Sequence, residues 1–441
     1  MVTIKPFKGL RYNPDKFCDL SEVITQPYDR IHDAEQAQYY ELSPYNYVRI
    51  IQGIRNPDEI ENNVYTRARG YALNWMAENA LIRDPEPALY VLEQTFTRPG
   101  DTSGVGYTRR GLTAVLELST FEEGVVLPHE RTLSGPKVDR LNLTQATQTG
   151  WGHVFMLYPD DDAEIAASLQ PFLDTHMPAI VHEQVIEPEV EQAFWVVNDP
   201  HVIATIVEKI KSKGPLIIAD GHHRYETALN YRDQMRIQYP EAPANAAFNY
   251  VMVTLVSMSD PGLVILPTHR LIYDYKRMDS KALLKALAPY FEITSMSDLD
   301  SLNAALAEAT QEQPRFGFYD GTYTLLTLKS LDTMAELLTD RDASFRALDV
   351  TVLHELIIEK VMGLSKESVA RKENLSYLRD PSSGFTAVDN GEANFLFLLN
   401  ATRIEQVRAC TAAGERMPQK STDFFPKVLS GLVAFPLNDT L

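Results

Sequence analysis

The sequence of 441 residues is poor in cysteine and has no long apolar run. Its two cysteines, Cys18 and Cys410, are too few for the disulfide framework of a secreted domain or for a zinc cluster. No stretch approaches the roughly 20 apolar residues of a membrane-spanning helix. The first residues, MVTIKPFKGLRYNP, lack the apolar core of a signal peptide. We therefore expect a cytoplasmic protein with no membrane partner.

Positive charge is also scarce. The chain has 41 Lys and Arg against 60 Asp and Glu, which gives a net charge of −19. A surface of this sign repels nucleic-acid phosphates, and no run of Lys and Arg offers a local basic patch. The sequence therefore predicts no nucleic-acid partner and points to a small-molecule substrate. It leaves open whether the chain forms a homo-oligomer.

Strand-like and helical patterns alternate along the chain. The runs 88–96 and 106–118 are rich in strand formers around a turn, which predicts an antiparallel hairpin with one face in the core. Residues 222–234 carry apolar groups at helical spacing. The stretch 125–141 is polar and punctuated by Gly and Pro, so we predict an irregular segment there. Together these patterns predict an α/β fold of the mixed α+β type, in which antiparallel strand pairs are common.

The length of the chain predicts more than one core, because a domain has roughly 150 residues. The pattern changes near residue 280, where two helical stretches, 280–291 and 298–309, follow one another. We therefore predict an N-terminal and central α/β region, 1–278, and an additional C-terminal α/β region, 279–441, which ends with the MPQKST tail.

The run LIIADGHHRYETAL is the most informative stretch. A buried strand is predicted to end at Asp220, and Gly221 permits the sharp turn from which a helix begins. The first amides of a helix lack internal partners and, with the helix dipole, favour an anion. His222, His223 and Arg224 add donors and positive charge there, and Arg can hold phosphate oxygens with two hydrogen bonds. We predict a phosphate- or nucleotide-binding turn.

Asp220 has three candidate roles in this turn: to hold a metal, with Mg²⁺ as the candidate, to take a proton, or to orient a histidine. The alternative is ordinary turn chemistry, in which Asp220 only caps the helix. Two adjacent histidines rarely both serve packing, which favours a functional site. A metal-dependent hydrolase stays a further alternative, with four candidate ligands: Asp220, His222, His223 and His129.

A second polar cluster lies in the stretch HERTLSGPKVDR. Phosphoryl transfer needs positive groups at the phosphate oxygens and a base near the acceptor hydroxyl. Glu130 or His129 is the candidate base, and Lys137 and Arg140 are candidates to neutralise the developing charge. The stretch is not an HExxH zinc motif, because position 133 is Leu. The alternative is a solvated loop with surface ion pairs.

The C-terminal stretch ERMPQKST supplies a third set of candidates. Lys420, Ser421 and Thr422 are predicted to donate to a second phosphate or to an acidic substrate. The Gly-rich frame of a Walker A motif is missing. The alternative is a docked tail with Phe424 and Phe425 in the core.

The strings DGHHRYETAL and ERMPQKSTDFFPK resemble the bacterial domain-of-unknown-function family 1015. Further stretches match the pattern of that family, so that the resemblance covers nearly the whole chain: FKGLRYNP, QPYDRI, SPYNYVRI, LPHERTLSGPKVDRL, LPTHRL and KVLSGLV. The name of this family implies little biochemistry.

The turn also resembles that of a wider group. Sulfiredoxins, ParB N-terminal domains and free serine kinases share one fold and hold nucleotide phosphates with a Gly-x-His-Arg or similar turn. DGHHR is similar to the Asp-Gly-x-His-Arg turn of the free serine kinases. The resemblance implies a ParB/sulfiredoxin-like core with a mixed sheet, phosphate contacts by His223 and Arg224, and Asp220 beside the transferring group. Position 222 is His rather than the Cys of sulfiredoxins, which disfavours sulfinic-acid repair.

These features together predict a kinase-like small-molecule phosphotransferase. It would move phosphate from ATP, ADP or pyrophosphate to a hydroxylated metabolite, and the distant resemblance suggests serine. The main alternative is a non-catalytic, nucleotide-binding regulatory protein of the ParB-like type, which keeps the phosphate turn but needs no acceptor site.

Overall fold

The described residues of the computed structural model form two compact units. Unit 1 comprises Met1–Pro128, Thr132–Val264 and Pro426–Leu441, and unit 2 comprises His129–Arg131 and Ile265–Phe425. The structure describes these residues: 1–56, 61–101, 104–130, 135–178, 180–183, 190–371 and 373–441.

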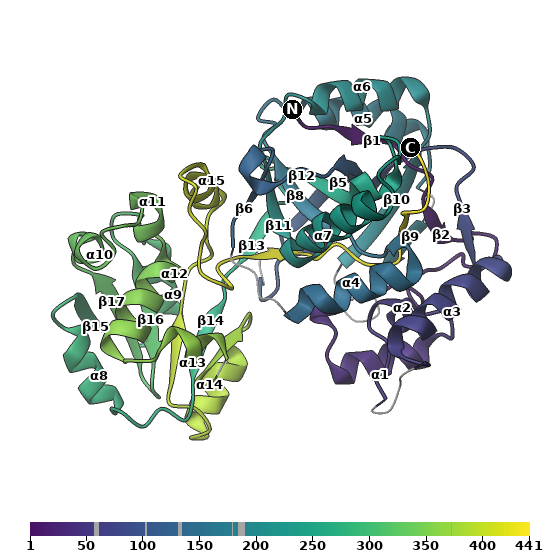
Figure 1. Cartoon of the computed structure of the whole chain (residues 1–441). Helices are drawn as coiled ribbons and strands as arrows, with labels where there is room; N and C mark the ends of the chain where they lie inside the picture. Colours follow the sequence, from purple (N-terminus) through teal and green to yellow (C-terminus); the bar gives the residue numbers. More distant parts are fainter. Residues whose placement is uncertain (57–60, 102–103, 131–134, 179, 184–189, 372) are drawn as a thin grey trace. The chain divides into compact units, whose positions relative to one another are not determined.

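Unit 1 is built on a nine-stranded mixed sheet (Figure 1) with the strand order β6-β11-β8-β12-β5-β4-β10-β9 and with β1 beside β5. The pairs β11–β6 and β12–β8 are parallel, and the other pairs are antiparallel. The predicted α/β fold with a mixed sheet is confirmed. The bounds of the strands are β1 (Ile4–Lys5), β4 (Leu89–Thr97), β5 (Gly106–Glu117), β6 (Val126–Pro128), β8 (Val154–Tyr158), β9 (Ile180–Glu183), β10 (Val190–Val197), β11 (Leu216–Asp220) and β12 (Tyr250–Ser257).

The helices of unit 1 pack on the sheet and on one another. α5 and α6 bury Leu169 and Ile206 in the same apolar core as Met156 of β8, and α4 lies beside α7 (Figure 1). The bounds of the helices are α1 (Asp33–Leu42), α2 (Val48–Ile51), α3 (Val64–Ala77), α4 (Gly135–Thr147), α5 (Glu164–Thr175), α6 (Pro200–Ile210) and α7 (His222–Gln238). Four short strands complete the unit: β2 (Leu10–Tyr12), β3 (Leu81–Arg83), β7 (Thr149–Gly150) and β21 (Phe435–Pro436).

The predicted hairpin is confirmed as β4 and β5, which pair in antiparallel register. The prediction of one buried face on β5 is wrong, because neighbours that point to opposite faces are buried alike. Ala114 is buried, and so are Thr113 and Val115 on either side of it. The hydroxyls of Thr113 and Thr254 lie 2.8 Å apart, which satisfies two polar groups on the second covered face.

The prediction of an irregular segment at 125–141 is also wrong. The segment contains β6, which pairs in parallel with β11, and the first half of α4. Pro136 is compatible with this helix because it falls in the first turn, where the amide that proline lacks has no partner within the helix. Glycine and proline therefore mark the start of a helix here rather than a long loop.

The C-terminal segment Pro426–Leu441 returns to unit 1 and is held there by backbone pairs. Its residue Ala434 exchanges hydrogen bonds with Leu10, and Ser430 with Thr25. The larger part of unit 2, Ile265–Phe425, lies in the sequence between two segments of unit 1. Local patterns do not reveal such long-range pairing.

Unit 2 is built on a six-stranded antiparallel sheet with the order β15-β17-β16-β19-β14-β18. β16 and β17 form an antiparallel hairpin around Asp320-Gly321. The bounds of the strands, including the small β13–β20 pair, are β13 (Val264–Leu266), β14 (His269–Ile272), β15 (Phe291–Ser295), β16 (Arg315–Tyr319), β17 (Tyr323–Leu328), β18 (Leu375–Leu378), β19 (Phe395–Leu398) and β20 (Asp423–Phe425).

The two helices predicted after residue 280 are confirmed as α8 and α9. α12 is followed directly by a π-helix, after which Gly363 stops the helical stretch at a φ of 70°. Among the described helices of the chain, none is long and apolar enough to cross a membrane. The bounds in unit 2 are α8 (Ser280–Leu287), α9 (Leu299–Ala307), α10 (Asp332–Leu337), α11 (Ala343–Arg346), α12 (Asp349–Thr351), the π-helix (Val352–Val361), α13 (Lys366–Ala370), α14 (Ser382–Asp389) and α15 (Ile404–Ala412).

Asp199 caps α6 and offers a test of the fold. Its carboxylate accepts hydrogen bonds from the first amides of α6. We expect Asp199→Ala to lower the free energy of unfolding of unit 1 by about 1 kcal/mol. Asp199→Asn should keep most of the stability that the cap contributes, because Asn also caps helices well. The three tryptophans, Trp75, Trp151 and Trp195, all lie in unit 1, so their fluorescence in a urea titration reports on this unit. Equal stability of the two variants would contradict the capping role.

Candidate functional site

β11 ends with a bulge directly before the DGHHR turn. Ile218 lies opposite Met156 of β8, but Asp220 lies opposite Phe155, so β11 carries one extra residue here. Bulges of this kind re-aim side chains and occur beside active sites. Gly221 then precedes the first residue of α7 with a φ of 94°, a backbone angle that residues other than glycine rarely adopt.

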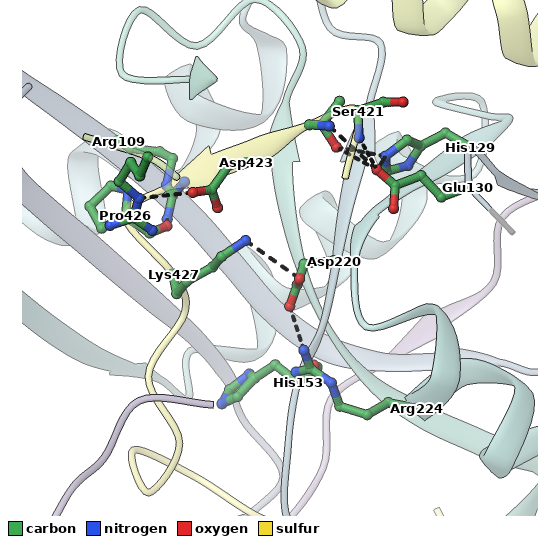
Figure 2. A network of polar contacts seen from close by, with 12 residues as sticks. Arg109, His129, Glu130, His153, Asp220, Arg224, Ser421, Asp423, Pro426 and Lys427 are labelled. Carbon is green, nitrogen blue, oxygen red and sulfur yellow. Dashed lines mark hydrogen bonds and ion pairs between the residues drawn. The ribbon is translucent and has the colours of Figure 1, made fainter. Parts of the chain in front are cut away.

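Asp220 lies between two cations (Figure 2). One carboxylate oxygen accepts a hydrogen bond from Arg224, and the other lies 3.5 Å from the Nζ of Lys427. Burial alone would raise the pKa of the Asp220 carboxyl, but Lys427, Arg224 and Arg30 outweigh it and hold that pKa well below its usual range. Asp220 is therefore ionised at neutral pH.

Lys427 is brought to Asp220 by a buried polar layer under the C-terminal segment. Arg109, which is 1 % exposed, donates to the carbonyl of Pro426 and to the side chain of Gln94. Gln94 donates in turn to the carbonyl of Lys427 over 3.0 Å. The Arg109 guanidinium also lies over the ring of Phe155, 4.9 Å from its centroid. These contacts fix the backbone from which Lys427 reaches Asp220.

Arg224 is engaged on two sides. It donates to the carbonyl of His153 and to Asp220, and its side chain lies against Gly152 and Gly221. A Cβ on Gly221 would come 3.0 Å from the Nε of Arg224, so only glycine fits beside the guanidinium without displacement. An arriving anion would therefore compete with Asp220 for Arg224.

The two histidines of the turn differ in burial. His222 is buried, whereas His223 is half-buried. Burial lowers the pKa of His223, and the charge of Lys137 adds to this effect while Glu226 opposes it. The ammonium group of Lys137 pairs with Glu226 over 2.7 Å. The helix that carries Lys137 is α4, which the sequence did not reveal.

Arg140 lies on the same helix and ties it to the QPYDR motif. Its guanidinium stacks on the ring of Tyr28, 4.0 Å from the centroid, and pairs with Asp139. It also donates to the carbonyl of Ile51 over 2.7 Å. Burial and the nearby Asp29 raise the pKa of Tyr28 to about 12, so its hydroxyl stays protonated.

The remaining predicted residues meet in unit 2. Glu130 accepts hydrogen bonds from the amides of Ser421 at 3.1 Å and Thr422 at 3.3 Å (Figure 2). The Nε2 of His129 lies 2.8 Å from the hydroxyl of Thr422. The side chain of Lys420 is exposed, and its backbone has a φ of 57°. The stretches around 130 and 420 thus share one polar cluster, and Arg131 to Ser134 lie outside the described residues.

Sequence reasoning missed Lys427 as a member of the site. The residue closes the string ERMPQKSTDFFPK and opens KVLSGLV, both of which carry the family resemblance. That coincidence was the available signal. The pairing with Asp220 depends on a contact between residues more than two hundred positions apart, which no local pattern predicts.

A single ionised carboxylate is a suitable ligand for Mg²⁺ only when phosphate oxygens complete the shell, because Mg²⁺ in such sites uses one or two carboxylates plus substrate phosphates. Within the described part of the chain, no group of three or more His, Cys, Asp or Glu side chains could hold a metal ion. The metal-dependent hydrolase alternative therefore finds no ligand set among the described residues.

The geometry defines an α/β protein with an ionised carboxylate held between two cations at a strand–helix junction. The chain belongs to the family described as protein of unknown function (DUF1015), whose model matches residues 4–351. The resemblance to this family is thus confirmed. A search of curated proteins found no match.

Several solved structures are weakly similar to the chain. A conserved hypothetical protein from Pyrococcus furiosus shares 13% identity, with 72% of this chain and 94% of that chain covered and a TM-score of 0.35. A free serine kinase in complex with AMP shares 13% identity, with 72% and 86% covered and a TM-score of 0.32. SbnI from Staphylococcus aureus shares 11% identity, with 71% and 84% covered and a TM-score of 0.33.

The charge network predicts how acid affects stability. Because the folded-state pKa of Asp220 is depressed, its contribution is present above the unfolded pKa of about 4 and is lost as the pH falls further. Asp220→Asn leaves Lys427 and Arg224 without their counter-ion, so we expect a loss of about 3 kcal/mol at pH 7. In urea titrations, the gap between the variant and the original protein should shrink below pH 4. A gap that stays constant to pH 3 would contradict the assignment.

The unit 2 cluster predicts a structural role for Glu130. Glu130→Ala removes the acceptor for two backbone amides, so we expect hydrogen exchange at Ser421 and Thr422 to speed up by roughly tenfold or more. Glu130→Gln keeps a side-chain oxygen at this position and should retain most of the protection. Unchanged exchange in Glu130→Ala would show that the carboxylate does not anchor this loop.

Proposed function

We propose that this protein is a kinase-like small-molecule phosphotransferase whose phosphate-binding centre lies in unit 1. The observation that carries the proposal is the ionised Asp220, fixed between Lys427 and Arg224 directly before the glycine that opens α7. Phosphoryl transfer depends on cations at the phosphate oxygens and on a well-placed carboxylate. The donor is ATP, ADP or pyrophosphate, and the acceptor is a hydroxylated metabolite such as serine.

The donor phosphates are assigned to the start of α7. Gly221 has no side chain to cap the helix, and the dipole of a 17-residue helix favours an anion at this end. His222, His223 and Arg224 extend from the same turn. Arg224 would exchange part of its contact with Asp220 for phosphate oxygens, since a guanidinium can serve two acceptors.

Asp220 is assigned a role in metal binding or positioning rather than in proton transfer. A carboxyl whose pKa is far below the working pH is a weak general base. Mg²⁺, when bound with a nucleotide, would supply positive charge for the phosphate oxygens, and Asp220 is the residue that would hold it. His223, whose pKa is lowered by burial, is neutral near pH 7 and offers a nitrogen that can accept a proton.

The polar cluster in unit 2 is a second candidate for contacts with an anionic substrate. Lys420 is exposed and is available to an anionic substrate, whereas Glu130 and His129 hold the loop that carries it. Lys137 and Arg140 are assigned to the support of α4 beside the turn, since both are paired with acidic neighbours.

A non-catalytic, nucleotide-binding regulatory protein is the second candidate function. The depressed pKa of Asp220 favours it, because the carboxylate nearest to the turn is unsuited to activate a hydroxyl. This candidate predicts tight nucleotide binding without any product and a ligand-dependent change in oligomeric state.

Phosphate transfer tests the proposal directly. Purified protein is mixed with Mg²⁺, a pool of hydroxylated metabolites that includes serine, and ATP, ADP or pyrophosphate in turn, and products are followed by ³¹P NMR. We expect transfer from at least one donor and a fall of roughly 100-fold in Asp220→Asn, as is typical when one electrostatic group is removed. Asp162→Asn, an exposed carboxylate of unit 1, is the matched control and should be unaffected.

If the protein neither turns over nor binds any of the three donors, the proposal is overturned. Binding without turnover would favour the regulatory candidate. A phosphorylated product whose rate is the same in Asp220→Asn would place the chemistry elsewhere in the molecule.

The state of His223 predicts how donor binding depends on pH. A phosphate next to His223 raises the pKa of the imidazole, so binding takes up a proton and strengthens as the pH falls from 8 to 6. We expect the affinity for ADP, measured by calorimetry, to rise more steeply over this range in the original protein than in His223→Gln. Because the ionisation of ADP affects both proteins equally, it cancels when the two slopes are compared. Identical slopes in both proteins would show that His223 does not face the phosphate.

A further inference from the structure

A pocket runs along one face of α7 in unit 1. Four residues of this helix line it at the spacing of a single helical face: Arg224, Thr227, Ala228 and Tyr231. The pocket is partly open to solvent.

The walls of the pocket are mainly apolar and aromatic. Tyr28, Trp151, Phe248 and Phe435 contribute rings, while Arg140 adds a cation to that of the DGHHR turn. A pocket with aromatic walls and few polar groups is suited to a flat ring, because aromatic faces stack on the bases of nucleotides.

One polar group in this pocket lacks a partner. Thr227 is 4% exposed, and its hydroxyl makes no hydrogen bond with any described residue. Threonines in helices commonly donate to the carbonyl four residues earlier. Thr144, which also lines the pocket, does so with Arg140, and Thr147 with Leu143. A buried hydroxyl without a partner is unfavourable, so Thr227 has a hydrogen bond to offer to a ligand.

Arg224 connects the pocket with the phosphate turn. It lies in the first turn of α7, and Tyr231 lies seven residues further, about 10 Å along the axis at the rise of an α-helix. A ligand whose flat ring lies near Thr227 would therefore reach toward the anion-binding end of the helix through Arg224.

We propose that this pocket receives the heteroaromatic base of a nucleotide, with the Thr227 hydroxyl hydrogen-bonded to the edge of the base and Arg224 facing the phosphates. The inference rests on the proposed function and narrows it: the phosphate donor is a nucleoside phosphate rather than pyrophosphate. Thr227 sets the preference for the base, and the DGHHR turn holds the anion.

The test compares ligands that carry one half of a nucleotide or both. Binding of ADP, adenosine, ribose 5-phosphate and pyrophosphate is measured by calorimetry on the full chain. We expect ADP to bind at least tenfold more tightly than pyrophosphate. Thr227→Val, which keeps the shape of the side chain, should weaken ADP binding by roughly tenfold, the loss of about one hydrogen bond, and leave pyrophosphate binding unchanged. Thr227→Ser should retain the affinity for ADP.

Two further variants make the result specific. Ala228→Leu fills the pocket and should reduce the binding of ADP and adenosine but not that of pyrophosphate. Thr205→Val removes a hydroxyl of α6 that donates to the His201 carbonyl outside the pocket, and it should change nothing. Tryptophan fluorescence in urea verifies that each variant is folded.

Equal binding of ADP and pyrophosphate, with no effect of Thr227→Val, would overturn the inference and leave the phosphate site standing. Failure of all four ligands to bind would overturn the proposed function and the inference together. Binding of adenosine but not of pyrophosphate would support the pocket and remove the anion site from α7.

Discussion

The charge balance around Asp220 is the constraint on which the arrangement of unit 1 depends. Lys427 is only 7% exposed and Arg224 11% exposed, and both contact the same carboxylate. Charges this far from water are stable only in pairs. The pairing of Asp220 with both cations requires three features to meet: the bulge of β11, the glycine after it and the returning C-terminal segment that carries Lys427. The strand–helix junction is thus a point where distant parts of the chain meet.

The same constraint shapes the chemistry of the site. A carboxylate held ionised by two cations is a poor proton acceptor, but it is a stable ligand for a metal or for a substrate cation. An incoming phosphate would shift the balance, because Arg224 can turn from Asp220 toward it while Lys427 still compensates the carboxylate. Binding of the proposed anion would therefore be linked to the internal ion pairs through one guanidinium.

Local patterns predicted the elements whose stability is local. The strand before Asp220 and the turn at Gly221 follow from residue type and spacing alone, and the structure has both. Features set by distant partners escaped prediction. The pairing of Lys427 with Asp220, the salt bridge of Lys137 and the burial of the second face of β5 all depend on such partners. The start of α4 was missed for another reason, because the proline in its first turn was interpreted as part of a loop.

A structure of the protein with ADP and Mg²⁺ bound tests the central claim most directly, namely that an anion binds at the start of α7 beside Asp220. The account predicts phosphate oxygens within hydrogen-bonding distance of the amides of His222–Arg224, and Asp220 next to the metal. A nucleotide bound elsewhere, with Asp220 still paired to Arg224 and Lys427 and the turn empty, would contradict it.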